Sequence, residues 1–438
     1  MNLEIESIEK IEGEIEVPGD KSITHRSLIF GAICKGDTVV YNPLKSEDCK
    51  ATIDCLKRLG VEIIQKKEFL IVKGTEGYLK ESDDILDCKN SGTTMRILSG
   101  LLATQRFYSV LTGDSSLRKR PMGRIIEPLR LMGAQIFGRT NNNFPPLTII
   151  GGKLKPIRYK LPVASAQVKS CLILASLFTE GVCEIEEPAI SRDHTERMVE
   201  YLGGRIEKDG NKMLVKGPQK LKGREIFIPG DFSSATFFIT LAALIRNSHL
   251  RITNLGLNPT RTGFLEVIKR MGVRFKISNL KELNNEPVGD IEIWGKGKMK
   301  GTKIDGKEIP LLIDEVPVIS LLSCFCEGET EISGAKELRF KESDRLRAIK
   351  TELTKMGADI IEKEDGLLIT GVGRLKGAEV YSWNDHRIAM MLAIAGCVAE
   401  GKTLVRNIEC IDVSFPEFFN LLRKIKISFR IIEKEEGK

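Results

Sequence analysis

The chain contains 438 residues, of which 42% are hydrophobic and 29% are charged, and its formal net charge is +7 at pH 7. This length exceeds the size at which one hydrophobic core usually stops growing, so we expect two domains. Charges of both signs are spread along the chain, which favours an anionic small-molecule ligand over a nucleic acid. The longest apolar runs are about half a membrane span, and the first residues do not resemble a secretory signal, so we expect a cytoplasmic protein without membrane contact.

Ten cysteines and four histidines are scattered through the chain. No Cys-x-x-Cys pair occurs and no histidines have the spacing of metal ligands, so we expect reduced, mostly buried thiols and no zinc site. The P-loop, dinucleotide-binding and Gly-x-Ser-x-Gly patterns are absent as well. Ser22 and His25 are three residues apart, but no acidic partner completes a hydrolase triad.

Six segments begin with small or polar residues and then stay apolar for about three turns, which predicts six buried helices. Their starts are 66 to 84 residues apart. In chain order they are DKSITHRSLIFGAI from Asp20, NSGTTMRILSGLLA from Asn90, ASAQVKSCLILASL from Ala164, GDFSSATFFITLAAL from Gly230, DEVPVISLLSCFC from Asp314 and NDHRIAMMLAIAGC from Asn384.

A glycine-containing turn, a β-like stretch and a second, amphipathic helix follow these segments. Five of the second helices end in RLGVEI, LMGAQI, YLGGRI, RMGVRF and KMGADI, where we expect the glycine to cap the helix. The sixth, RKIKISF, has no such glycine. The repeated unit is therefore helix, strand, helix, strand, strand, and six units predict an α/β protein with two domains of pseudo-threefold symmetry.

The motif Pro-Gly-Asp occurs twice, in VPGDKSITHRS (17–27) and in IPGDFSSATFF (228–238). We place the domain boundary at the second copy. The first 17 residues contain a predicted strand without a helix of its own, which could complete the sheet of the C-terminal half. We therefore expect an N-terminal domain of residues 18–228 and a C-terminal domain of residues 1–17 plus 229–438, with crossovers near 18 and 229.

Cations gather at several predicted helix starts, although a helix N-terminus already carries about half a positive charge. Lys21, Ser22 and Arg26 open the first helix, with Ser22 and Arg26 on one face. Arg120 ends an Arg-Lys-Arg cluster, and Arg387 lies in the first turn of the sixth helix. Each could be a solvated surface cation, but their repetition at dipole-disfavoured positions indicates an anion-binding site.

Two carboxylates accompany these cations in the second half of the sequence. Asp314 opens an apolar helix, where it could serve as a simple N-cap. Glu342 lies in RFKESDRLR, where Lys341 and Arg345 have i,i+4 spacing and Glu342 could form an i,i+3 surface pair with Arg345. The alternative for both is a role in acid–base chemistry.

The motifs PGDKSITHR, NSGTTMR, RKRPM, SAQVKS, SRDHTE, KESDRL, NDHRIAM and SFPEF occur in this order over the whole chain. Together they resemble the 3-phosphoshikimate 1-carboxyvinyltransferase (EPSP synthase) family. The resemblance implies two domains of three βαβαββ units with buried parallel helices, an inside-out α/β barrel. It also implies transfer of the enolpyruvyl group of phosphoenolpyruvate to the 5-hydroxyl of shikimate 3-phosphate, without metal or organic cofactor.

The resemblance assigns ligand-binding roles residue by residue. The residues that match the shikimate 3-phosphate site are Lys21, Ser22, Arg26, Ser165, Gln167, Ser191, Arg192, Asp314 and Lys341. Those that match the phosphoenolpyruvate site are Lys21, Asn90, Gly92, Thr93, Arg120, Gln167, Arg345 and Arg387, where planar guanidinium groups suit carboxylate and phosphate.

The reaction needs one group that takes the hydroxyl proton and another that delivers a proton to the methylene carbon. By the same resemblance we expect Asp314 to be the base. Glu342 would handle the methylene proton, and Lys21 would act as acid and phosphate clamp. Which of Lys21 and Glu342 gives the first proton stays open.

Three positions depart from the family pattern: Ala166 replaces a serine, Glu337 an asparagine and Val413 a lysine. Ala166 removes a phosphate contact, for which Arg192 could compensate.

Two alternative functions remain. A UDP-N-acetylglucosamine enolpyruvyl transferase would carry a cysteine in the loop before Arg-Pro, but GDSSLRKRP has none. The other is a non-catalytic protein that binds phosphate or nucleic acid. We expect a monomer whose domains close on the ligand.

Overall fold

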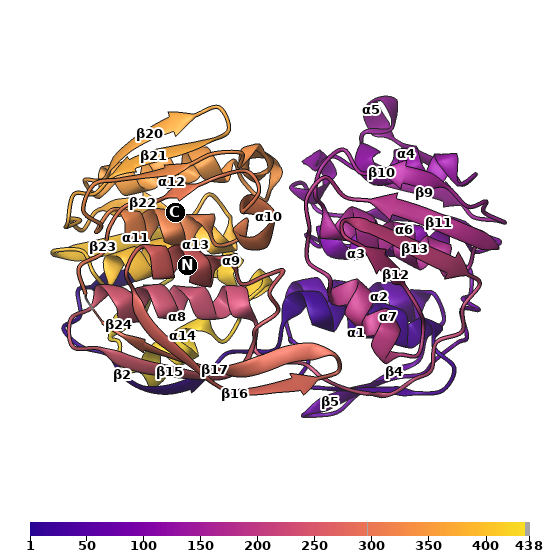
Figure 1. Ribbon diagram of the computed structural model, residues 1–438, viewed down its shortest axis with the longest axis horizontal. Helices are drawn as coiled ribbons and strands as arrows, with labels where there is room; N and C mark the ends of the chain where they lie inside the picture. Colours follow the sequence, from indigo (N-terminus) through magenta and orange to yellow (C-terminus); the bar gives the residue numbers. More distant parts are fainter. Residues whose placement is uncertain (296, 434–438) are drawn as a thin grey trace. The chain divides into compact units, whose positions relative to one another are not determined.

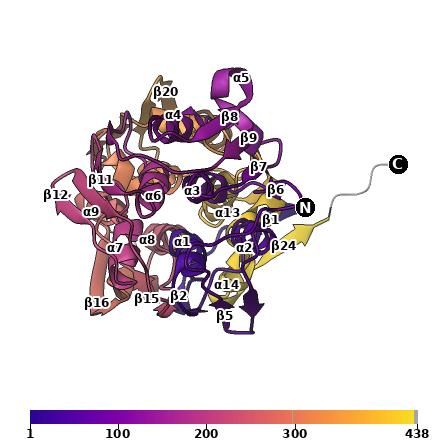
Figure 2. The ribbon, with the colours of Figure 1, turned by 90° about the vertical axis from the view of Figure 1, so that its right-hand side faces the viewer.

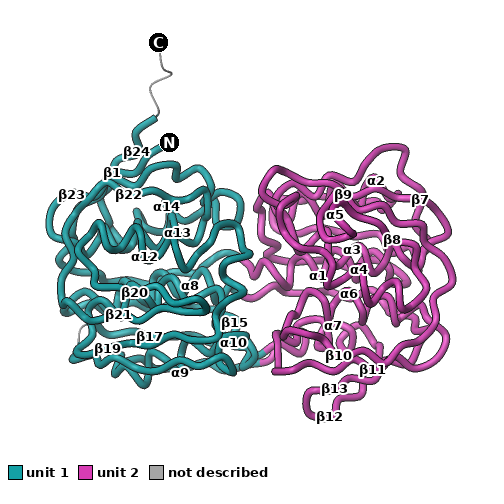
Figure 3. The backbone as a smooth tube through the Cα atoms, turned by 90° about the horizontal axis from the view of Figure 1, so that it is seen from above, with its two compact units in different colours: residues 1–18, 230–281, 287–438 teal, residues 19–229, 282–286 magenta. Residues whose placement is uncertain are grey.

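The structure is a computed structural model that describes residues 1–295 and 297–433. The chain forms two compact units (Figure 3). Unit 1 comprises Met1–Pro18, Gly230–Lys281 and Pro287–Lys438, and unit 2 comprises Gly19–Pro229 and Glu282–Glu286. The short segment Glu282–Glu286, which the sequence analysis did not set apart, belongs to unit 2 although it links two strands of unit 1.

Unit 2 contains three four-stranded sheets with one shared pattern. The first two strands of each sheet are parallel, and the other neighbours are antiparallel. In strand order the sheets are β14 (Glu225–Phe227), β3 (Thr38–Tyr41), β5 (Phe69–Val72) and β4 (Ile63–Gln65); β6 (Leu86–Asp87), β7 (Tyr108–Thr112), β9 (Phe144–Ile150) and β8 (Gln135–Gly138); and β10 (Arg158–Lys160), β11 (Gly181–Glu186), β13 (Lys212–Gly217) and β12 (Glu207–Asp209).

Three buried helices fill the centre of unit 2, and Figure 2 shows them nearly end-on: α1 (Lys21–Ile33), α3 (Gly92–Leu102) and α6 (Ala166–Ser176). Each begins at a side chain that accepts a hydrogen bond from the first turn: Asp20, Ser91 and Ser165. The amphipathic helices are α2 (Glu47–Arg58), α4 (Gly123–Leu131) and α7 (His194–Tyr201), with the short α5 (Arg139–Asn142) and the 3-10 helix η1 (Leu117–Lys119).

Unit 1 repeats this architecture with three more four-stranded sheets (Figure 1). They are β2 (Glu12–Glu16), β15 (His249–Gly256), β17 (Glu286–Trp294) and β16 (Arg274–Leu283); β18 (Lys303–Ile304), β19 (Glu329–Ile332), β21 (Gly366–Thr370) and β20 (Asp359–Lys363); and β22 (Glu379–Tyr381), β23 (Lys402–Arg406), β1 (Asn2–Glu6) and β24 (Phe429–Ile432). The predicted strands alternate with helices, as the repeat requires.

The buried helices of unit 1 are α8 (Phe232–Leu244), α11 (Val316–Ser323) and α13 (His386–Gly396). The other helices are α9 (Gly263–Arg270), α10 (Ile309–Leu312), α12 (Arg345–Lys355), α14 (Phe418–Lys424), and the 3-10 helices η2 (Lys336–Phe340) and η3 (Ile408–Val413). All six predicted apolar segments are therefore buried helices. No helix of the described residues has both the length and the apolar composition needed to cross a bilayer.

The N-terminal segment differs from its prediction as one strand. It forms two strands, and each completes a different sheet of unit 1: β1 lies between β23 and β24, and β2 pairs with β15. Between them the chain is held by bonds from the amides of Ile8 and Ile11 to Cys397 O and Ser248 Oγ. The segment is divided because its two halves pair with strands that are far away in the sequence. A local sequence pattern contains no information about such pairing.

Apart from the short segment Glu282–Glu286, the chain passes from one unit to the other at Pro18–Gly19 and at Pro229–Gly230. These two crossings lie side by side, because Asp20 N donates to Pro229 O and Asp231 N donates to Pro18 O, each over 2.8 Å. Glycine is required at position 19 because the backbone of Asn42 approaches it closely: a Cβ there would lie 2.1 Å from Asn42 O.

The second helices end as the repeated glycine predicts. Gly60, Gly133, Gly203, Gly272 and Gly357 all have φ between 83° and 99°, and in each case the next amide reaches back to a carbonyl five residues earlier. The sixth helix ends in the same way, but the left-handed residue is Lys426, with φ of 63°. The five predicted glycine caps are confirmed, and the sixth helix has the same cap geometry with Lys426 in place of a glycine.

The ten cysteines are unpaired, and all except the half-buried Cys410 are buried, which confirms the prediction of mostly buried thiols. Burial raises the pKa of Cys34 and of Cys49 to about 12. A thiol with such a pKa is a poor nucleophile at neutral pH, so these side chains act as core residues.

Candidate active site

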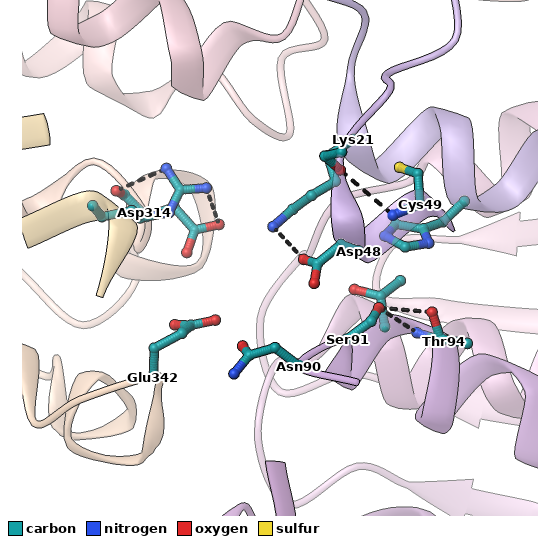
Figure 4. Close-up of polar contacts among 12 residues, drawn as sticks. Lys21, Asp48, Cys49, Asn90, Ser91, Thr94, Asp314 and Glu342 are labelled. Atoms are coloured by element: carbon teal, nitrogen blue, oxygen red, sulfur yellow. Dashed lines mark hydrogen bonds and ion pairs between the residues drawn. The ribbon is translucent and has the colours of Figure 1, made fainter. Parts of the chain in front are cut away.

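The first helix of unit 2 presents Lys21 at its first position. Asp20 caps the helix by accepting from Ile23 N at 2.9 Å, and Lys21 Nζ lies 3.0 Å from Asp48 Oδ2 (Figure 4). Asp48 comes from the first turn of α2, so two helix starts meet at this pair. The lysine side chain remains 18% exposed.

Arg26 lies one turn further along α1 and is buried. Its guanidinium donates to Thr195 Oγ1 at 2.7 Å, to Ser170 Oγ at 2.8 Å and to the backbone oxygen of Ser22 at 2.9 Å. Burial lowers the pKa of Arg26 to about 10, although the charge of Glu196 opposes this shift. The guanidinium therefore stays a cation at neutral pH. Its bond to the Ser22 backbone agrees with the prediction that Ser22 and Arg26 lie on one face of the helix.

A second cluster lies at the start of α3. Arg120, the residue after η1, donates to Asn90 Oδ1 at 2.6 Å and to Asn90 O at 3.3 Å. A Cβ on Gly92 would lie 2.9 Å from a nitrogen of Arg96, which would have to shift, and 3.5 Å from one of Arg120, which is an ordinary contact distance. The predicted residues Asn90, Gly92 and Arg120 are therefore neighbours.

Gln167 joins this cluster from α6. Its amide nitrogen donates to Thr93 Oγ1 at 2.8 Å, and its oxygen accepts from Arg96 at 2.5 Å. Arg96 was not predicted from the sequence. Its position one helical turn after Gly92 could have indicated that it lies near the same site.

The loop before α7 carries Ser191 and Arg192. Ser191 is buried, and its hydroxyl donates to Glu187. The charge of Arg192 acts on Arg26, so these two predicted phosphate ligands lie close enough to interact electrostatically. Ser165 caps α6 by accepting from Val168 N at 3.5 Å, next to Ala166.

In unit 1, Asp314 lies among three cations. Its carboxylate oxygens are 3.3 Å from Arg345, 3.6 Å from Lys341 and 3.6 Å from Arg387. The N-cap of α11 is Glu315, not Asp314, so the alternative of a simple cap is wrong for this residue. The Asp314 carboxylate therefore joins the three cations of this cluster.

Arg345 holds the carboxylates of this cluster together. It bonds Glu342 at 2.6 Å and Asp385 at 2.8 Å, and its side chain is only 1% exposed. Burial disfavours its charge, but the charges of Asp385, Glu342 and Asp314 outweigh burial and raise the pKa of Arg345. Burial likewise opposes ionisation of Asp385, yet Arg345 and nearby groups lower the pKa of that carboxyl.

Two local interpretations of this cluster need correction. Lys341 and Arg345 do not share a helical face, because Lys341 follows η2 and α12 begins only at Arg345. They meet through Asp314 instead. The Glu342–Arg345 pair exists, but it is not on the surface, since the two side chains are 17% and 1% exposed.

Asp48 and Asp385, which orient Lys21 and Arg345, were both missed from the sequence. They are 27 and 40 residues away from their partners, and both read as ordinary helix-start residues. Within the described residues, no group of three or more His, Cys, Asp and Glu side chains is placed to hold a metal ion.

A sequence model of the family "EPSP synthase (3-phosphoshikimate 1-carboxyvinyltransferase)" matches residues 5–422. The chain belongs to this family. It is 49% identical over 432 residues to the 3-phosphoshikimate 1-carboxyvinyltransferase of Petrotoga mobilis, covering 97% of this chain and 100% of that protein. It is 49% identical over 419 residues to that of Thermoanaerobacter sp., covering 96% and 99%.

Solved structures agree with this EPSP synthase assignment. The EPSP synthase of Acinetobacter baumannii superposes with a TM-score of 0.88 and 41% identity, over 99% of both chains. The enolpyruvyl transferase NikO of Streptomyces tendae has a TM-score of 0.78 at 16% identity over 98% of both chains, which supports the fold alone. The predicted family and fold class are confirmed.

Proposed function

We infer that this EPSP synthase family member transfers the enolpyruvyl group of phosphoenolpyruvate to the 5-hydroxyl of shikimate 3-phosphate and releases phosphate. The family match over nearly the whole chain carries this conclusion. The site supports it, because each unit presents cations at helix starts next to carboxylates that can move protons. Such a set suits two anionic substrates and an addition–elimination reaction.

Shikimate 3-phosphate is bound mainly by the starts of α1 and α6 and the loop before α7. Arg26 and Arg192 supply charge, and their mutual interaction is a repulsion that a phosphate would relieve. The complete proposed set is Lys21, Ser22, Arg26, Ser165, Gln167, Ser191, Arg192, Asp314 and Lys341. Ala166 brings no hydroxyl to this set, and Arg192 supplies the compensating cation.

The groups proposed to bind phosphoenolpyruvate include the guanidinium groups of Arg120, in unit 2, and Arg345, in unit 1. Arg120 is oriented by Asn90, and Arg345 by Asp385. The complete proposed set is Lys21, Asn90, Gly92, Thr93, Arg120, Gln167, Arg345 and Arg387. Val413, at the end of η3, offers no cation where many relatives have a lysine.

Asp314 acts as the base that takes the proton of the 5-hydroxyl while the oxygen attacks the second carbon of phosphoenolpyruvate. Glu342 and Lys21 manage the proton at the methylene carbon, which becomes a methyl group in the ketal intermediate. Elimination then removes a methyl proton and releases phosphate, whose charge the neighbouring cations stabilise. No metal or organic cofactor takes part in this proposal.

We further propose a cytoplasmic monomer whose partners are these two small molecules, without nucleic acid or membrane. The test is phosphate release from phosphoenolpyruvate by the purified chain, with and without shikimate 3-phosphate. Release should depend on shikimate 3-phosphate. Release that instead depends on UDP-N-acetylglucosamine, or no release with either acceptor, would contradict the proposed function. A steep salt dependence of RNA binding without turnover would favour a nucleic-acid-binding protein.

A further inference from the structure

Lys169 is among the most deeply buried charged side chains of the described residues, and no step of the proposed reaction uses it. It lies on α6, one turn after the N-cap Ser165, and its side chain is 1% exposed. Lysine is almost never fully buried unless it is paired. Its place therefore needs a specific reason.

The three N–H donors of an ammonium group match three acceptors around Lys169 Nζ. They are Glu187 Oε2 at 2.8 Å, Glu196 Oε1 at 2.8 Å and the backbone oxygen of Ser191 at 3.2 Å. Both carboxylates are buried as well, with side chains 4% and 3% exposed. The two acidic neighbours keep the lysine charged, and although burial opposes this, they raise its pKa.

These acceptors belong to three different parts of the phosphate site. Glu187 follows β11 and also accepts from the hydroxyl and the amide of Ser191. Glu196 lies on α7 beside Thr195, which accepts from Arg26. The next residue of α6, Ser170, accepts from Arg26 too and contacts Thr195 at 2.6 Å. Lys169 thus joins α6, α7 and the Ser191 loop at one point.

Four buried charged side chains lie around this point. Arg26 and Lys169 contribute two cations, and Glu187 and Glu196 contribute two anions; the charge of Glu196 acts directly on Arg26. Removing one member of a buried set leaves an uncompensated charge, which costs far more than the pair contributes. Loss of Lys169 would therefore leave Glu187 and Glu196 without their shared cation and would remove the bond to the backbone oxygen of Ser191.

We propose that Lys169 is a positioning residue for shikimate 3-phosphate: it fixes Ser191–Arg192 and, through Glu196, the environment of Arg26. This inference rests on the proposed function. Lys169 does not touch the substrate. The groups proposed for phosphoenolpyruvate do not depend on it, because Arg120 is held by Asn90, and Gln167 by Thr93 and Arg96.

The test is steady-state kinetics of Lys169→Met, which removes the ammonium and keeps an unbranched chain. We expect the KM for shikimate 3-phosphate to rise about 10- to 100-fold, the size expected for lost hydrogen bonds to charged groups, and the KM for phosphoenolpyruvate to stay within about threefold. The double variant Lys169→Met/Glu187→Gln restores the charge balance. It should recover roughly fivefold or more of the lost affinity, which a purely steric role would not allow.

The matched control is Lys160→Met, because Lys160 pairs with Glu186 at 3.0 Å but its side chain is 70% exposed. It should change neither KM. If Lys169→Met does not fold, Glu187→Gln is measured in its place, with an expected rise of about 3- to 10-fold for shikimate 3-phosphate only. Equal changes in both KM values, or none, would overturn the inference. A wild-type chain without turnover would instead refute the proposed function.

Discussion

At the scale of single residues, the proposed reaction depends most on Asp314, which we propose as its base. Its carboxylate has three cationic neighbours, which favour its ionised form. Asn has the same shape but cannot accept the hydroxyl proton. We expect Asp314→Asn to lower kcat by about 10²-fold or more, the scale of a lost general base. The KM values for both substrates should stay equal or fall, because the neutral amide no longer competes with the anionic substrates for the neighbouring cations. Asp359→Asn, an exposed carboxylate of the same unit, is the control; near-normal turnover in Asp314→Asn would exclude the base role.

His25 predicts a specific pH dependence of stability. Burial, followed by the charges of Lys21 and Arg26, lowers the pKa of His25 well below its usual value of 6.5. In the unfolded chain His25 therefore binds a proton near pH 6.5, whereas in the folded chain it stays neutral at that pH. The free energy of unfolding should fall as pH drops below about 6.5, by up to about 1.4 kcal/mol per pH unit until the folded pKa is reached. Above about pH 6.5, His25 adds no pH dependence to the free energy of unfolding.

The measurement is thermal unfolding at pH 7.5, 6.5 and 5.5 for the wild type and for His25→Gln. The variant loses the bond from the imidazole to Thr52 Oγ1 (2.7 Å), so its stability at pH 7.5 should be lower. Its decline between pH 6.5 and 5.5 should nevertheless be shallower than that of the wild type. Parallel declines would show that His25 is not the group that titrates.

At the scale of elements, the two Pro-Gly-Asp helix starts differ in a way that only packing explains. The second start carries no cation of its own, yet Arg261 reaches it from another segment. Arg261 donates to Asp231 at 3.1 Å and to Ser233 at 3.0 Å, and Ser233 bonds Glu315, next to Asp314. The first start therefore carries a partly exposed lysine, whereas the second forms a buried ion pair with Arg261.

The six similar helix ends allow a prediction about stability. Lys426 adopts φ of 63°, where a non-glycine residue is disfavoured by about 1–2 kcal/mol. Because glycine also loses more backbone entropy on folding, we expect Lys426→Gly to gain only about 0.5–1 kcal/mol, or about 1–3 °C in Tm. Gly357→Ala is the matched opposite: φ is 93° and no atom lies within 4 Å of the added Cβ, so only backbone strain can lower its Tm. A fall in Tm for Lys426→Gly would contradict the argument.

At the scale of the whole molecule, the proposed ligands come from both units. Lys21, Arg26 and Arg120 belong to unit 2, whereas Asp314, Arg345 and Arg387 belong to unit 1. We propose that the crossings at Pro18–Gly19 and Pro229–Gly230 act as a hinge. An anionic substrate that binds both sets of residues should favour a closed state, and closure would keep water from the ketal intermediate.

Small-angle scattering tests this closure. The radius of gyration should fall when shikimate 3-phosphate is added, alone or with glyphosate as a mimic of phosphoenolpyruvate. An unchanged radius at saturation, with binding confirmed by calorimetry, would rule out closure for this protein. Arg26→Ala provides a control, since a variant that no longer binds the phosphate should keep the radius of the free chain at the same ligand concentration.

The sequence by itself determined the local features of this protein. Apolar segments of helical length, their capping residues and the glycine at five helix ends depend on nearby residues, so they predicted six buried helices and an α/β class. The ordered motifs indicated the family as well as Lys21, Arg26, Asp314 and Arg345. These properties depend on the sequence itself, so they could be predicted without the tertiary structure.

The tertiary structure decided which side chains became partners. The pairs Lys21–Asp48, Arg345–Asp385, Arg261–Asp231 and Lys169–Glu187 join residues 18 to 40 positions apart. The division of the N-terminal segment between two sheets joins residues hundreds of positions apart. Burial makes an uncompensated charge or an open strand edge costly, so the packed chain must pair each of them. Which partner lies within reach depends on how the helices and sheets pack, and no short stretch of sequence contains that information.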